Sequence, residues 1–157
     1  MRTIKQPDDW SCMVACIQMA TLRPRQEILQ AIKRTDKREY KSGIDIYRFI
    51  PYLYRLKIII GPGDLALATP TDYEYLDEIN VRVIFENTIG ILSVNSERFK
   101  NKLHAVFWDG QNIRDPNPNH GELSSMDSYI IQYYAPLVYL DNKLLKSIEN
   151  HYHGNCG

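Results

Sequence analysis

Residues 104–115 read HAVFWDGQNIRD, and this stretch predicts a β-hairpin with a histidine and an aspartate at its open end. The apolar run HAVFW is typical of a strand, and the Asp109-Gly110 pair that follows is favoured in two-residue hairpin loops of type I′. With these two residues as the loop, the ladder places His104 directly opposite Asp115. Directly opposed residues have Cβ atoms about 4.5–5.5 Å apart. We therefore expect a hydrogen bond between this imidazole and this carboxylate.

The pairing of His104 with Asp115 suits a general base and its orienter. A carboxylate bound to one ring nitrogen fixes the tautomer and stabilises the imidazolium that forms when the other nitrogen accepts a proton. The alternative is that His104 is a half-buried histidine whose hydrogen-bonding need is met by a neighbouring acid, without a catalytic role. The other histidines, His120, His151 and His153, lie in expected loop or tail segments and receive no role.

Cys12 stands where an extended entry segment, residues 1–11, gives way to a helix expected from 12 to about 21. The free N–H groups and the dipole of a helix N-terminus favour an anion, so the pKa of the Cys12 thiol should fall. A thiolate attacks carbonyl carbon, and the backbone N–H of Cys12 with the side chain of Gln6 are candidate donors to the resulting oxyanion. Cys16, one turn further, is expected to be buried and inert. The alternative is that Cys12, like Cys16, is only a small buried apolar residue without a catalytic role.

The remaining pattern predicts helices first and a sheet afterwards. Helices are expected over about 24–33, 44–56 (capped by Ser42 and kinked at Pro51), 72–79, near 126–133 and from about Asn142, and strands at 57–60, 81–85, 89–94, 104–108, 111–114 and about 136–140. This order indicates one α+β domain over residues 1–157. We expect a helical lobe of about 1–56, a β lobe of about 57–141, and a C-terminal helix and tail at 142–157.

Composition excludes several classes of function. A chain of 157 residues fits one domain, and 19 basic residues balance 19 acidic ones, so no overall field favours nucleic acid or an anionic membrane. No apolar run approaches the roughly 20 residues of a membrane span, and no signal peptide is visible. The basic stretch 33–41 contains Asp36 and Glu39, which favours a solvated loop. The 3 cysteines form no disulfide framework, so a reducing, cytoplasmic setting is expected.

Two sets of side chains are candidate metal ligands. The tail HYHGNCG, residues 151–157, carries three of them, namely His151, His153 and Cys156. No fourth ligand at a recognised spacing accompanies them, which favours an untethered terminus. A second set consists of Cys12, Cys16 and His104. A metal there would leave Asp115 unexplained, whereas catalysis gives Asp115 a role. We therefore expect no metal at either place.

Two motifs resemble those of the C39 peptidases, found in bacteriocin-processing domains and in stand-alone relatives. The first is QPDDWSCMVACIQMA, residues 6–20, with Gln6 six positions before Cys12 at the start of a helix. The second is HAVFWDGQNIRDPNP, residues 104–118, in which a histidine opens a strand and Asp-Pro closes the next. The stretch LSSMDSYIIQYYAPLVYL, residues 123–140, is similar to the short helix and final strand that follow in that family.

The resemblance implies a papain-like fold and cysteine attack on a peptide or amide carbonyl without a cofactor. It assigns the catalytic roles to Gln6, Cys12, His104 and Asp115. It also implies a peptide or protein substrate, and a stand-alone protein of bacterial or phage type. Family members attached to transporters cut leader peptides after paired glycines, but this chain has no transporter portion, so that substrate does not carry over.

The chain departs from the family pattern beside the cysteine. The family usually has Asp before and Gly after it, whereas this chain has Ser11 and Met13. A methionine at this place narrows the expected cleft or alters the backbone that forms the oxyanion hole.

The sequence thus predicts a cysteine peptidase or a related thiol hydrolase. Deconjugation, deamidation or amide transfer through the same acyl-enzyme stay open, since a fold does not determine its substrate. The rival from another class is a non-catalytic papain-like module that binds or inhibits a host or partner protein. The two readings differ in how fast Cys12 is alkylated at about pH 6. Neither nucleic acid nor membrane is expected as a partner, and the oligomeric state is left open.

Overall fold

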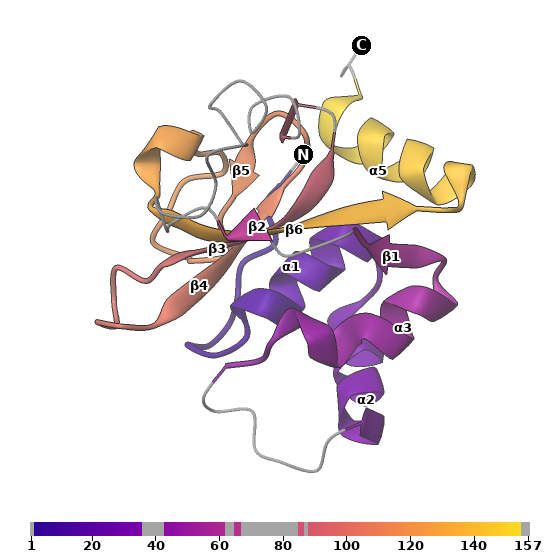
Figure 1. The fold of residues 1–157 in the computed structure, drawn as a ribbon, viewed down its shortest axis with the longest axis horizontal. Coiled ribbons are helices and arrows are strands. Elements are labelled where there is room, and N and C mark those ends of the chain that lie inside the picture. Colours follow the sequence, from indigo (N-terminus) through magenta and orange to yellow (C-terminus); the bar gives the residue numbers. More distant parts are fainter. Residues whose placement is uncertain (1, 36–42, 62–64, 67–84, 87, 155–157) are drawn as a thin grey trace.

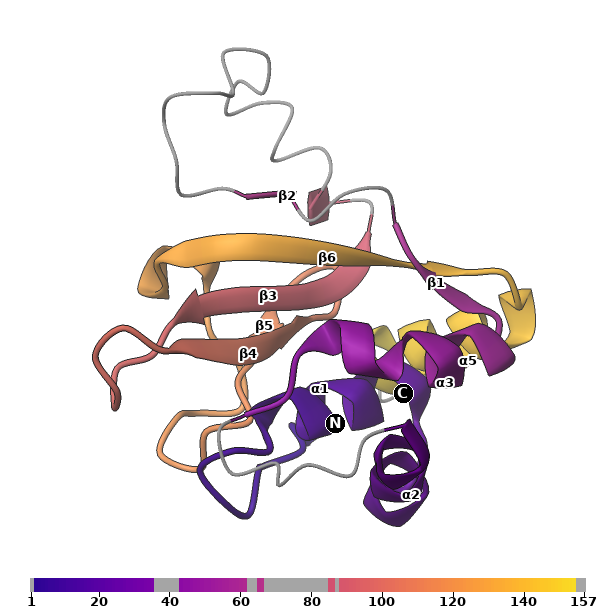
Figure 2. The same cartoon turned by 60° about the horizontal axis from the view of Figure 1, so that its bottom comes forward.

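An antiparallel sheet lies in the middle of the molecule, and helices cover one of its faces (Figures 1 and 2). The computed structural model describes residues 2–35, 43–61, 65–66, 85–86 and 88–154. The strands are β1 (Ile58–Ile60), β2 (Leu65–Ala66), β3 (Ile89–Asn95), β4 (Leu103–Trp108), β5 (Ile113–Arg114) and β6 (Ile131–Tyr139). Their order is β1-β6-β3-β4-β5, with β2 also paired to β6, and all the pairings are antiparallel. The α+β class that the sequence predicts is confirmed.

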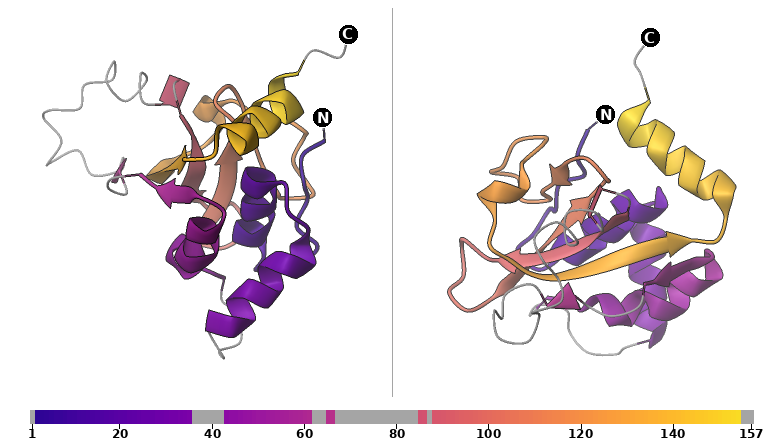
Figure 3. Two further views of the ribbon diagram at one scale, coloured as in Figure 1. Left: turned by 90° about the vertical axis from the view of Figure 1, so that its right-hand side faces the viewer. Right: turned by 45° about the horizontal axis from the view of Figure 1, so that its top comes forward.

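The helices come mostly before the sheet along the chain. They are α1 (Cys12–Thr21), α2 (Arg25–Thr35), the 3₁₀ helix η2 (Ile46–Phe49), α3 (Ile50–Arg55), the 3₁₀ helix η3 (Met126–Ser128) and α5 (Asn142–His153). Figure 2 shows α1, α2 and α3 on one side of β3, β4 and β6. Figure 3 shows α5 folding back from the end of β6. The predicted helices that begin at Cys12, near Pro24 and at Asn142 are confirmed.

Helix α1 is buried along almost its whole length. Of its 10 residues, only Cys12 and Gln18 are not buried. At its C-terminal end the hydroxyls of Tyr139 and Tyr152 donate to the carbonyls of Ala20 (2.8 Å) and Met19 (3.0 Å). The helix also packs against β4. Its far end is thus anchored to β6 and α5, and its N-terminus lies against the strand that carries His104.

Strand β4 is apolar on both faces because each face contributes to a separate core. Ala105 and Phe107 belong to the larger core, which α1 and the other helices close. Val106 and Trp108 belong to a smaller core on the opposite face, together with Phe85. Alternating side chains point to opposite faces of a strand. The continuous run HAVFW is therefore what a strand buried on both sides requires.

Two predicted helices differ from the structure. Residues 46–55 form a 3₁₀ turn followed by α3 rather than one helix over 44–56, because Pro51 stands at the start of α3, where it needs no hydrogen bond. The Asp45 side chain accepts the N–H of Tyr47 and so supplies the N-cap. The helix expected near 126–133 is only η3, since β6 already begins at Ile131.

Several predicted features fall outside the described residues. These are the helix over 72–79, the cap at Ser42, and positions 81–84 of the strand expected over 81–85. Phe85 itself is helical rather than extended.

Candidate active site

The first residue of α1 presents the candidate nucleophile. Burial by itself would raise the pKa of the Cys12 thiol. The hydrogen bond and charge of His104, with the backbone N–H groups of Ala105 and Met13, outweigh burial and lower that pKa. The Met13 amide is one of the free N–H groups at the start of a helix, so the helix-terminus contribution predicted from the sequence is present. The side chain of Ser11, the N-cap residue, makes no capping hydrogen bond.

The hairpin that carries His104 and Asp115 has a longer loop than the sequence predicts. Phe107 pairs with Arg114 and Trp108 with Ile113, so the predicted register is wrong by two residues. Asp109 does not adopt the positive φ that a type I′ turn demands; only Gly110 does, at 96°. A shift of one residue would turn every side chain to the other face, but a shift of two keeps the faces. His104 and Asp115 therefore still meet.

The predicted hydrogen bond between imidazole and carboxylate is confirmed. His104 Nε2 lies 2.6 Å from Asp115 Oδ1. Because this carboxylate occupies Nε2, the other ring nitrogen, Nδ1, is left for the Cys12 thiol. Burial opposes a charge on the imidazole, but the hydrogen bonds to Asp115 and Cys12 raise the pKa of His104 to about 9. A protonated imidazole thus lies between a thiol and a carboxylate.

Asp115 is held as an anion although its side chain is only 1% exposed. Burial raises the pKa of this carboxyl group, but the hydrogen bond and charge of His104 outweigh it. The backbone N–H of Asn117, 2.8 Å from Oδ1, and the hydroxyl of Tyr129 also lower the pKa. Hydrogen bonds to the charged form favour it. The carboxylate is therefore available to orient His104.

Gln6 lines a cavity together with Cys12 and His104, but its side chain is hydrogen-bonded to a neighbouring residue. Its Nε2 donates to the carbonyl of Asp8 at 2.5 Å, and its Oε1 has no hydrogen-bond partner among the described residues. The Gln6 backbone N–H donates to the carbonyl of Pro116 at 2.8 Å, which ties this segment to the residue after Asp115. A carboxamide has two N–H hydrogens. The bond to Asp8 leaves one of them for another acceptor.

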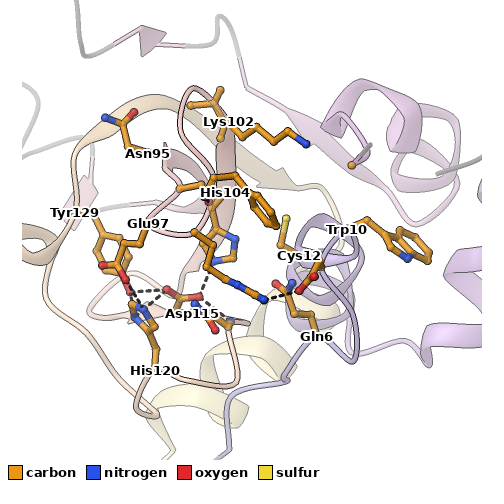
Figure 4. Close-up of a pocket in the computed structure, with 17 residues that line it drawn as sticks. Gln6, Trp10, Cys12, Asn95, Glu97, Lys102, His104, Asp115, His120 and Tyr129 are labelled. Atoms are coloured by element: carbon orange, nitrogen blue, oxygen red, sulfur yellow. Dashed lines mark hydrogen bonds and ion pairs between the residues drawn. The ribbon is translucent and has the colours of Figure 1, made fainter. Parts of the chain in front are cut away.

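Two cavities meet at Cys12 and His104. The smaller, of about 120 Å³, contains all four candidate residues, Gln6, Cys12, His104 and Asp115 (Figure 4). The larger, of about 640 Å³, is mainly apolar and is lined by residues that include Ile46, Ile91, Ala105 and Ala135. The thiol of Cys12 and the imidazole of His104 therefore stand where the two cavities adjoin.

Sequence reasoning missed Tyr129 and His120, which the fold brings to Asp115, and Glu97, which contacts His120. Tyr129 donates to Asp115 Oδ2 at 2.7 Å, and His120 Nδ1 lies 3.2 Å from the same oxygen. His120 Nε2 in turn contacts Glu97 Oε2 at 3.1 Å. All three line the smaller cavity (Figure 4). They lie in loops without periodic patterning, so no spacing rule points to them.

The other sequence candidates have different surroundings. Cys16 is fully buried, and burial raises the pKa of its thiol well above the ordinary value. His151 and His153 belong to α5 rather than to an untethered tail, and His153 Nε2 lies 2.7 Å from the carbonyl of Asp109. Cys156 and most of the basic stretch 33–41 lie outside the described residues. Within the described ranges, no group of three or more metal-binding side chains is found.

Comparison of the chain with protein-family models, with curated proteins and with solved structures found no match. Among the helices of the described residues, none has the length and apolar character needed to cross a bilayer.

Proposed function

We propose that this protein is a thiol hydrolase that cleaves a peptide or amide bond through an acyl-enzyme on Cys12. The observation that carries the proposal is the line of contacts from the Cys12 thiol through His104 to Asp115, in which Nε2 and Oδ1 lie 2.6 Å apart. A nucleophile, a base and an orienter in this order are the mark of covalent acyl transfer. The choice of peptide bonds, and of a papain-like architecture, rests on the C39 resemblance of the two motifs.

The first step is attack by the thiolate. The sulfur of Cys12 forms a bond to the carbonyl carbon, and the π electrons of the carbonyl move to its oxygen. We assign the Cys12 backbone N–H and the second N–H of Gln6 as the donors to that oxygen. Donors of this kind contribute about 3–4 kcal/mol to the stability of such a transition state.

The second half of the reaction moves one proton through His104. The imidazolium gives its Nδ1 proton to the leaving nitrogen as the C–N bond breaks, which leaves a thioester on Cys12. Water then attacks the thioester while His104 accepts a proton from it. The C–S bond breaks, a carboxylic acid leaves and the thiolate returns. Asp115 keeps Nε2 protonated throughout and so holds Nδ1 toward the sulfur.

The proposal includes a reducing, cytoplasmic setting, since the mechanism needs Cys12 as a free thiol. Among the described residues, Cys12 and Cys16 are both free.

Cleavage is tested with the whole chain on a mixture of cellular proteins. We expect wild type to create new amino termini that mass spectrometry detects and that Cys12→Ala does not create. Cys16→Ala is the matched control, because Cys16 lies one turn away in the same helix but is sealed from the cavity. It should give the same new termini as wild type.

New termini that persist in Cys12→Ala would overturn the assignment of the nucleophile. If wild type makes no new termini, released ammonia and changed side-chain amides are measured in the same mixture. Ammonia that depends on Cys12 would support a deamidase or amide transferase that uses the same acyl-enzyme. The absence of both products would favour the non-catalytic binding module.

A further inference from the structure

The extended segment before α1 is hydrogen-bonded to the loop that follows β5. The backbone N–H of Gln6 donates to the carbonyl of Pro116 at 2.8 Å. Thr3 donates to Glu122 twice, from its backbone N–H to the carboxylate at 2.5 Å and from its hydroxyl to the carbonyl. Gln6 and Asp115, two members of the proposed site, therefore lie on segments that hydrogen bonds join directly.

The side chain of Lys5 joins the same two segments. Its Nζ donates to four backbone carbonyls within residues 115–121, namely those of Asp115 (2.9 Å), Asn117 (3.3 Å), His120 (3.0 Å) and Gly121 (2.9 Å). A lysine side chain ends in an ammonium group with three N–H donors and no acceptor, so it fits a point on which several acceptors converge. The loop thus surrounds this nitrogen as it would surround a bound cation.

The loop 115–121 has little regular structure to fix its shape. These residues belong to neither a helix nor a strand, and Pro116 and Pro118 have no backbone N–H to donate. A carbonyl oxygen carries a partial negative charge, so carbonyls that converge on one point repel one another unless a cation lies between them. A partly buried carbonyl that loses its partner also destabilises the conformation that holds it. We therefore expect the shape of this loop to depend on Lys5.

We propose that Lys5 is a positioning residue that holds the loop 115–121 in the shape that places the Asp115 carboxylate on His104. The proposal rests on the function proposed above and adds a residue to its site. Lys5 binds the backbone carbonyl of Asp115 at 2.9 Å, and the carboxylate of that same residue lies 2.6 Å from His104 Nε2. Lys5 touches no reacting atom; it acts through the position of Asp115.

The titration of His104 reports on this position. Burial lowers the pKa of His104, but the hydrogen bonds to Asp115 and Cys12 raise it to about 9. The other charged or titratable side chains that line the smaller cavity or lie near Lys5 are Asp9, Glu97, Arg98, Lys102, His120 and Glu122. A substitution of Lys5 leaves all of these in the chain. Loss of one positive charge, taken alone, favours another cation nearby and so raises the pH at which His104 loses its proton.

The test follows the imidazole of His104 by NMR in the full chain labelled with ¹³C and ¹⁵N histidine. Lys5→Met keeps an apolar stem but removes the ammonium group. If Lys5 positions Asp115, the midpoint of His104 should fall from about pH 9 by about one unit or more, because the carboxylate is no longer held on the ring. A pure effect of charge has the opposite sign. A purely structural contact would lower the free energy of unfolding without moving the midpoint.

Two comparisons make the result specific to the loop. Lys102→Met is the matched control, because Lys102 lines the same cavity but its Nζ lies over the ring of Phe99. Its His104 midpoint should not fall. In Asp115→Asn the carboxylate is already lost, so adding Lys5→Met should lower the midpoint by less than it does in wild type.

An unchanged or raised midpoint in Lys5→Met overturns the inference, and so does an equal fall in Lys102→Met. A fall that is as large in Asp115→Asn as in wild type does the same. The inference places Lys5 in neither apolar core, so a Lys5→Met chain that circular dichroism shows to be unfolded also contradicts it. If wild-type His104 instead titrates near pH 6.5, as an isolated histidine does, the proposed function itself fails.

Discussion

Two members of the proposed triad, Cys12 and Asp115, accept hydrogen bonds from backbone N–H groups as well as from the side chain of His104. The sulfur of Cys12 accepts hydrogen bonds from backbone N–H groups of α1 and β4. The carboxylate of Asp115 accepts one from the backbone N–H of Asn117. The lowered pKa of the thiol and the pKa of about 9 for His104 define the pH window of the thiolate–imidazolium pair. The pair forms as pH rises through the thiol pKa and is lost as His104 gives up its proton near pH 9.

A substitution of Gln6 distinguishes stabilisation of the oxyanion from activation of the Cys12 thiol. On a peptide bond identified by the cleavage experiment, Gln6→Leu should lower kcat by about 10²–10³-fold, because a donor to the oxyanion is lost. Alkylation of Cys12 by iodoacetamide at about pH 6 should change by less than about twofold, because that displacement forms no oxyanion. Steady-state kinetics and mass spectrometry measure the two rates.

Ser11→Ala is the control for Gln6, since Ser11 is also buried beside Cys12 and its hydroxyl has no partner in the described residues. It should leave both rates near those of wild type. An equal fall of kcat and alkylation in Gln6→Leu would show that Gln6 only supports the local structure.

Among the elements, the β4–β5 hairpin shows what patterning can and cannot predict. The apolar run placed β4, and the alternation of faces was enough to bring His104 to Asp115. The predicted two-residue loop was wrong because Asp109 has stronger partners than a type I′ turn offers. Its carboxylate accepts hydrogen bonds from the backbone N–H groups of Gln111 (2.9 Å) and Asn112 (2.8 Å) and forms an ion pair with Arg114. Such tertiary pairing is invisible in a dipeptide preference.

The buried pair formed by Asp109 and Arg114 fastens the hairpin to α5. Their Oδ2 and Nε atoms are 2.6 Å apart, with both side chains nearly inaccessible to solvent, and the Arg114 guanidinium lies over the ring of Tyr152. Removing one partner of a buried ion pair leaves an uncompensated charge. We expect Asp109→Ala to lower the free energy of unfolding by about 3 kcal/mol or more. Urea denaturation followed by circular dichroism measures this change.

The ion pair of Asp9 and Arg98 serves as the exposed counterpart of the buried pair, since its side chains are 58% and 49% exposed. Arg98→Gln should lower the free energy of unfolding by less than about 1 kcal/mol. Equal costs for the two variants would contradict the structural role assigned to the buried pair.

For the whole molecule, the site depends on three segments that meet only in the fold. The N-terminus of α1, the start of β4 and the residue after β5 bring together positions 12, 104 and 115. The sequence predicted these elements and this trio, because helix ends and strand alternation are local. It did not predict His120 beside Asp115 or Glu97 beside His120, because the latter pair joins two loops 23 residues apart. Contacts between loops follow no repeat that a sequence displays.

His104, which Asp115 orients, lowers the pKa of the Cys12 thiol, so the thiolate forms at a lower pH than in an ordinary cysteine. The most direct test is the rate at which iodoacetamide alkylates Cys12 in the intact chain at about pH 6, followed by mass spectrometry of the Cys12 peptide. A free cysteine is well under about 1% thiolate at this pH. We predict that Cys12 reacts at least about tenfold faster than free cysteine, and that Asp115→Asn removes most of the difference. A wild-type rate no higher than that of free cysteine would show that His104 does not activate the Cys12 thiol.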